Sequence, residues 1–119
     1  MLLSQLEEEL LADLSRHAHG LWEIFEFVSL HAPVFSDGET LEAGRDVLAS
    51  WSQRGWLEVM AASGQPLAGI DIVAMIDALG DSALVPSPAV PRIGLSAKAY
   101  KDVDWLTARR DELLKIQSV

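Results

Sequence analysis

The sequence predicts a mainly α-helical fold with a small β-ribbon, which places it in the α+β class. Over most of the chain, apolar residues recur at three- and four-residue spacing, as they do on one face of a helix. Only two short segments, Trp56–Ala61 and Arg92–Leu95, carry residues typical of strands. The chain has 119 residues, 50% of them apolar and four of them tryptophan, enough for one compact core. We therefore expect residues 1–119 to form a single domain.

The first predicted helix covers about Gln5–Ala18. Ser4 followed by Glu7 has the spacing of a capping box, in which each side chain bonds the backbone amide of the other residue. Gly20 is expected to close the helix. Its apolar stripe consists of Leu3, Leu6, Leu10 and Leu14.

The second predicted helix, about Leu21–His31, is apolar almost all round. Glu23 and Glu26 are its only acidic residues, so we expect the helix to be central and buried. The next segment, Ala32–Gly38, contains a proline and several turn formers, which predicts a loop.

The third predicted helix lies in the stretch Thr40–Val59, which reads as a helix, a glycine stop at Gly55 and the start of a strand. Its apolar residues share one face, which predicts burial of that face. They are Leu41, Gly44, Val47, Leu48 and Trp51. The opposite face carries Glu39, Glu42, Asp46, Ala49 and Gln53, so it is acidic.

The predicted strands at Trp56–Ala61 and Arg92–Leu95 are separated by about thirty residues, far more than an ordinary hairpin needs. We therefore expect residues 62–91 to form an insertion with structure of its own. Its first part, Leu67–Leu79, is nearly continuous in apolar residues and predicts a helix. Its second part, Gly80–Pro91, is rich in proline and predicts irregular structure.

The last predicted helix begins near Ala97, with Ser96 as its cap. We expect an interruption near Asp104, after which the helix resumes through Ile116. Its buried side is expected to comprise Tyr100, Val103, Leu106, Leu113 and Ile116.

Two segments give the chain a family resemblance. Asp46–Val59 is similar to the third helix and first wing strand of bacterial winged helix-turn-helix regulators. Arg92–Asp102 resembles the return strand and the leucine-threonine-x-x-glycine helix start of that superfamily. The matching positions are Leu95, Ser96 and Lys98, whereas Ala99 replaces the family's glycine. The resemblance implies a winged-helix domain with a helical insertion between the two wing strands, and DNA binding as a function.

Charge is distributed unevenly along the chain. The net charge is −9; residues 1–91 hold 14 acidic and 3 basic residues, and residues 92–119 hold 4 acidic and 6 basic ones. DNA-binding proteins gain much of their affinity by neutralising phosphates with Lys and Arg, so an acidic body works against that function. A basic protein partner suits this charge better.

These observations give two hypotheses of function. The first is a non-enzymatic protein-interaction domain of the adaptor, inhibitor or immunity type. Its expected contact residues are Glu39, Glu42, Asp46, Gln53 and Trp56. The alternative is a DNA-binding transcription regulator that acts as a dimer. It requires a local basic patch formed by Arg45, Arg54, Arg92, Lys98 and Lys101. The sequence leaves open whether the chain forms a homodimer.

Enzymatic and metal chemistry find little support in the sequence. His17 and His19 are two positions apart, which on a helix separates them by about 200° and argues against a shared zinc ion. We expect both to cap the helix end or face solvent. No nucleophile-elbow or phosphate-loop spacing is present, so we predict no enzyme, no cofactor and no metal. The absence of cysteine, of a basic leader and of a long apolar run predicts a cytoplasmic protein without membrane contact.

Overall fold

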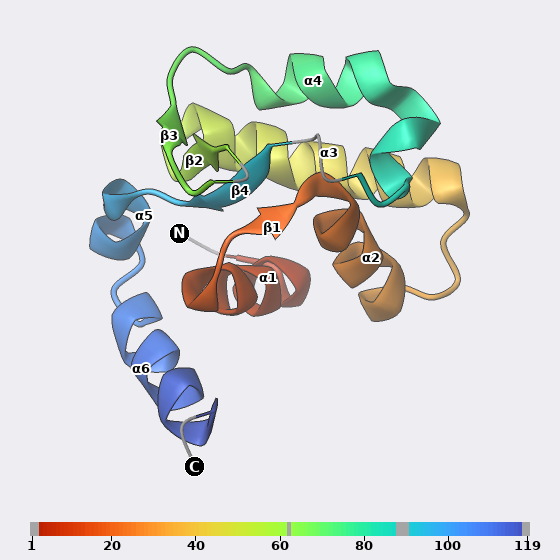
Figure 1. Ribbon diagram of the computed structural model, residues 1–119. Helices are drawn as coiled ribbons and strands as arrows, with labels where there is room; N and C mark the ends of the chain where they lie inside the picture. Colours follow the sequence, from red (N-terminus) through yellow and green to blue (C-terminus); the bar gives the residue numbers. More distant parts are fainter. Residues whose placement is uncertain (1–2, 62, 88–90, 118–119) are drawn as a thin grey trace.

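A computed structural model describes residues 3–61, 63–87 and 91–117, with the side chains of residues 113, 114, 116 and 117 excepted. The fold is mainly helical and contains a small antiparallel sheet (Figure 1). The helices are α1 (Gln5–Arg16), α2 (Leu21–His31), α3 (Asp37–Gln53), α4 (Ile72–Leu79), the 3₁₀ helix η1 (Gly80–Leu84), α5 (Ala97–Asp102) and α6 (Leu106–Gln117). The strands are β1 (His19–Gly20), β2 (Leu57–Met60), β3 (Pro66–Leu67) and β4 (Arg92–Leu95).

The sheet has four strands in the order β1-β4-β2-β3, all antiparallel to their neighbours. Its central pair is the predicted one, since β2 and β4 align Leu57 with Leu95 and Val59 with Ile93. The expectation of a two-stranded ribbon is wrong, because β1 and β3 extend it at either edge. Both added strands are two residues long, so pairing with β4 and β2 holds them in extended form.

The element boundaries near β1 and β3 differ from the predicted ones. Helix α1 ends at Arg16 rather than near Gly20, because His17 adopts an extended backbone at φ −165° and ψ 156°. The helix expected from Leu67 begins only at Ile72, where the Asp71 side chain accepts a hydrogen bond from the backbone amide of Ala74. The residues before that cap are free to pair with β2 instead. Beyond η1, residues 88–90 of the expected irregular segment lie outside the described chain.

The α2–α3 connection is shorter than predicted. Helix α3 begins at Asp37 rather than Thr40, because Ser36 and Glu39 form a reciprocal capping box. Helix α1 has the predicted box at Ser4 and Glu7. Helix α2 is buried as expected at Leu21, Ile24, Phe25 and Val28, but not at its carboxyl end, where Leu30 is 75% exposed as the helix leaves the core.

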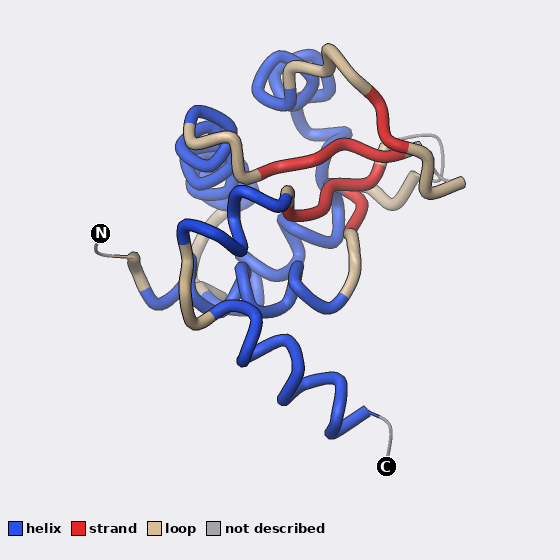
Figure 2. Tube along the Cα trace, turned by 90° about the vertical axis from the view of Figure 1, so that its left-hand side faces the viewer, coloured by secondary structure: helices blue, strands red, loops and turns tan. Residues whose placement is uncertain are grey.

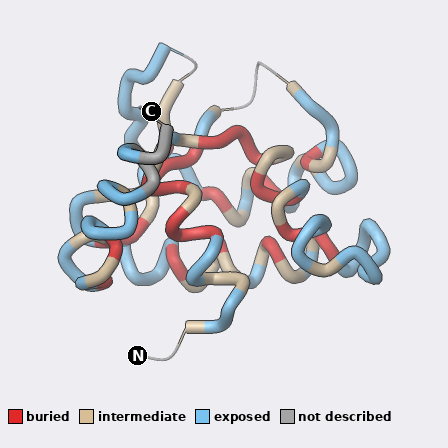
Figure 3. The backbone as a smooth tube through the Cα atoms, turned by 90° about the horizontal axis from the view of Figure 1, so that it is seen from below, coloured by how far each residue is buried: buried red, intermediate tan, exposed pale blue. Residues whose placement is uncertain are grey.

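The core lies where α1, α2 and α3 meet the sheet (Figures 1 and 3). Trp51 of α3 and Trp56 before β2 are both fully buried, with ring centroids 6.3 Å apart. The indole nitrogen of Trp51 donates to Glu7 Oε2 at 3.0 Å, which ties α3 to the start of α1. Phe25 of α2 packs directly against the backbone of α3 at Gly44.

The carboxyl-terminal helices follow the predicted pattern, with a break between α5 and α6 at residues 103–105. Ser96 occupies the N-cap position of α5 as predicted, but its side chain makes no capping hydrogen bond, and its hydroxyl donates to the Gly55 carbonyl at 2.6 Å. Helix α6 lies beside α1 and then runs away from the body (Figure 2). Val103 and Leu106 are buried as predicted, whereas the side chains of Leu113 and Ile116 lie outside the described part.

Candidate functional site

The outer face of α3, defined by Glu39, Glu42, Asp46 and Gln53, is exposed as predicted. It lies opposite the side of α3 that carries the buried Gly44, Leu48 and Trp51. Glu39 is partly occupied by its capping box. Glu42 forms no ion pair within the described residues, and Arg45 is the only base in α3. This face therefore presents negative charge to solvent.

Trp56, the fifth expected contact residue, is wrongly assigned to the interface. Its side chain is 0% exposed, and its indole nitrogen donates to Asp102 Oδ2 at 2.9 Å. The guanidinium of Arg54 lies 5.0 Å from the centre of its ring. Because the turn after α3 places Trp56 against Trp51 in the core, it cannot contact a partner without unfolding.

The five basic residues of the alternative hypothesis do not form one patch. Arg45 binds Asp77 of α4 with two hydrogen bonds of 2.7 and 2.9 Å. The hydrogen bonds from Arg45 hold the pKa of Asp77 below its usual value. At the start of β4, Arg92 donates to the Ala18 carbonyl at 2.8 Å. Two of the five bases are thus occupied in separate places.

The other three bases gather at one place, which we call the Asp102 cluster. Lys98 pairs with Asp102, and Arg54 lies over the Trp56 ring beside them. Hydrogen bonds from Lys98 and the Trp56 indole, together with the charges of Lys98 and Lys101, lower the pKa of Asp102. Asp102 thus lies near Lys98, Lys101 and Arg54, and its pairing with Lys98 offsets part of their positive charge.

His19 is far more buried than the sequence predicts. It is only 7% exposed, with Nε2 2.8 Å from Asp13 Oδ2 and Nδ1 3.0 Å from Glu23 Oε2. Each ring nitrogen of His19 thus lies within hydrogen-bond distance of a carboxylate oxygen. The expectation of a helix-end or solvent-facing His19 is wrong, because β1 carries the ring between α1 and α2. The four-residue spacing of His19 and Glu23 is the one signal in the sequence.

His19 belongs to a group of charged and polar side chains that come from four elements: Asp13 of α1, His19 of β1, Glu23 of α2 and Arg92 of β4. Partial burial raises the pKa of Glu23, but hydrogen bonds from His19 and the Gly20 amide and the charge of Arg92 hold it below its usual value. Burial and the neighbouring His19 lower the pKa of His17. No group of three or more His, Asp or Glu residues suited to a metal ion occurs among the residues described. The arrangement fastens α1, β1, α2 and β4 together.

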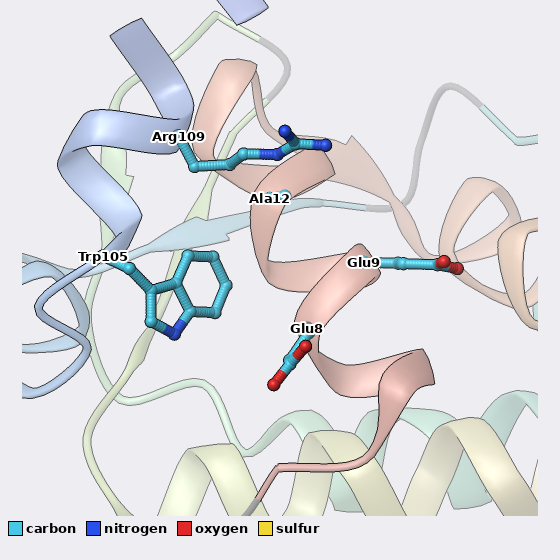
Figure 4. A pocket seen from close by; sticks show the side chains of 5 residues that line it. All are labelled: Glu8, Glu9, Ala12, Trp105 and Arg109. Carbon is cyan, nitrogen blue, oxygen red and sulfur yellow. The ribbon is translucent and has the colours of Figure 1, made fainter. Parts of the chain in front are cut away.

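The described surface carries several grooves, and two of them are formed mainly by helices. One, of about 350 Å³, lies between α1 and α6, where Trp105 faces Glu8 and Arg109 reaches over α1 (Figure 4). The second, of about 550 Å³, we call the α2–α3 groove. Its lining residues are Trp22, Phe25, Glu26, Ser29, Asp37, Thr40, Leu84 and Pro86. Half of these lining residues are apolar, and two of the others are acids.

Comparisons with protein-family models, curated proteins and solved structures found no match to this chain. Throughout the described ranges, no helix has the length and apolar character needed to cross a membrane. The described surface offers three candidate features for binding: an acidic outer face on α3, the Asp102 cluster and the α2–α3 groove.

Proposed function

We propose that this chain is a non-enzymatic protein-interaction domain, of the adaptor, inhibitor or immunity type, which binds a basic protein partner with the outer face of α3. The observation that carries the proposal is the exposed row Glu39, Glu42 and Asp46, from which the helix's only base, Arg45, is drawn away by Asp77. Long-range attraction between this face and a basic surface raises the association rate and orients the partner.

Charge reversal on this face tests the proposal. Glu42→Lys with Asp46→Lys is expected to reduce partner binding at least about tenfold, because two attractive contacts become repulsive. Both positions are exposed, so the free energy of unfolding should change by less than about 0.5 kcal/mol. The measurement is affinity capture from lysate of the native host, quantified by mass spectrometry, followed by titration of the captured protein.

The matched control is Glu58→Lys with Asp104→Lys, which makes the same change in net charge at exposed positions off α3. This control should retain the partner. Equal capture by wild type and the α3 variant, or equal loss with both variants, would remove the outer face as the binding surface.

A second candidate is a winged-helix DNA-binding regulator, which also forms a homodimer. Two observations favour it. Arg54, Lys98 and Lys101 gather in the Asp102 cluster, and the strands that resemble wing strands, β2 and β4, pair with each other. The net charge of −9 opposes it, since phosphates would have to approach an acidic body.

A further inference from the structure

The α2–α3 groove is built from two segments of the chain that lack both Lys and Arg. Residues 17–44 and 55–91 include neither Lys nor Arg, although they hold nine acidic residues. These two stretches supply every residue that lines the groove. His31, at the end of α2, lies two residues beyond the lining residue Ser29, and its Nδ1 is 2.9 Å from Oε2 of Glu9 in α1. The residues that line the groove therefore include two acids, Glu26 and Asp37, and no Lys, Arg or His.

The groove has an apolar part, formed by Trp22, Phe25, Leu84 and Pro86. Phe25 is fully buried at its base, and Trp22 and Leu84 are half-buried along its sides. The adjoining chain exposes further apolar residues, with Val34 89% and Val85 58% exposed. A volume of about 550 Å³ lies within the range of roughly 300–1,000 Å³ typical of ligand clefts. Exposed apolar surface of this kind marks interaction sites.

Two acids flank this apolar surface. Glu26 of α2 and Asp37 at the start of α3 both line the groove and are exposed, and neither forms an ion pair within the described residues. A ligand that fills the groove with an apolar side chain and carries Lys or Arg beside it satisfies both features. A neutral apolar ligand leaves the two carboxylates without a partner.

We propose that the α2–α3 groove binds a segment of the protein partner in which a large apolar side chain stands next to Lys or Arg. This inference rests on the proposed function and adds an apolar anchor to the charged contact made by the outer face of α3. The two surfaces lie on different sides of α3, since Thr40 of the groove is buried while Glu42 and Asp46 are exposed. They are therefore separable by substitution.

The probe is a display library of random peptides of about twelve residues, selected on the full chain. Selected peptides are synthesised, labelled and titrated by fluorescence anisotropy against wild type and three variants. Ser29→Trp fills the groove from an exposed position, and Glu26→Lys reverses its charge at another. Glu42→Lys with Asp46→Lys alters the outer face only. Thermal melts establish that each variant is folded.

We expect enriched peptides to combine Leu, Phe or Trp with Lys or Arg. Their Kd should rise at least about tenfold with Ser29→Trp and with Glu26→Lys separately, and less than about twofold with the outer-face variant. Amide shifts of Glu26, Ser29 and Thr40 in NMR spectra should move on titration.

Three results would overturn the groove assignment. Peptides weakened only by the outer-face variant would leave the proposed function standing and remove the groove from it. Apolar peptides without a base would contradict the chemistry assigned to the partner. Acidic peptides that bind at the Asp102 cluster would overturn the groove and the proposed function together.

Discussion

Replacing Gly44 with alanine is expected to destabilise the protein by about 1–3 kcal/mol, although alanine is the better helix former by about 1 kcal/mol. A Cβ atom at this position would lie 2.6 Å from Phe25 Cδ1 and closer still to Cε1. Phe25 is fully buried, so its ring cannot move aside without disturbing the contact between α2 and α3. Larger side chains at position 44 should prevent folding.

A second glycine in the same helix provides the control. At Gly38 the nearest atom to a new Cβ is Ser36 Oγ at 4.0 Å, so Gly38→Ala should be neutral or stabilising by up to about 1 kcal/mol. Urea unfolding measures both variants, and Phe25→Leu with Gly44→Ala should recover part of the loss by making room. A Gly44→Ala protein as stable as wild type would show that the two helices do not approach this closely.

Truncating Trp56 to alanine is expected to cost about 3–5 kcal/mol of unfolding free energy. The side chain is fully buried beside Trp51 and donates a hydrogen bond to Asp102, so both packing and a polar contact are lost. Trp56→Phe keeps a ring in the core but leaves Asp102 without the indole donor, and it should cost about 1–2 kcal/mol.

Measuring both stability and partner binding of the Trp56 variants distinguishes a core role for this residue from an interface role. If Trp56 is a core residue, each truncation lowers the free energy of unfolding in proportion to the number of buried atoms removed, as measured by chemical denaturation. Trp105→Ala serves as the comparison, because that ring is only half-buried and should cost less. If Trp56→Ala changed stability by less than about 0.5 kcal/mol while abolishing partner capture, Trp56 would be an interface residue after all.

Much of the helical framework could be predicted from the sequence because the signals are local. The capping box at Ser4, the even apolar spacing of α3 and the break between α5 and α6 are each set within a few residues. The pairing of β2 with β4 was also predictable, since only two segments had strand character. Helix α3 starts earlier than predicted because the capping box of Ser36 and Glu39 defines its first turn.

The remaining features depend on contacts between distant parts of the chain. Strands β1 and β3 are too short to carry a pattern, and they exist only because β4 and β2 pair with them. The position of His19 between two carboxylates arises from the packing of α1 against α2. Likewise, Arg45 is paired with Asp77, which lies 32 residues away in the chain, and so it does not join the other bases of the predicted DNA-binding patch. The α2–α3 groove needs η1 beside α2, which no local spacing indicates.

A DNA-binding titration distinguishes the proposed protein-interaction function from the DNA-binding alternative. Labelled mixed-sequence duplex DNA is titrated with the full chain by fluorescence anisotropy over a salt series that begins near about 20 mM. An acidic protein-interaction domain should show no binding at any salt, because three bases around Asp102 do not outweigh the net charge of −9. DNA binding at micromolar protein concentration, with an affinity that falls steeply with salt, would contradict the proposed protein-interaction function and point to the Asp102 cluster as a DNA-binding surface.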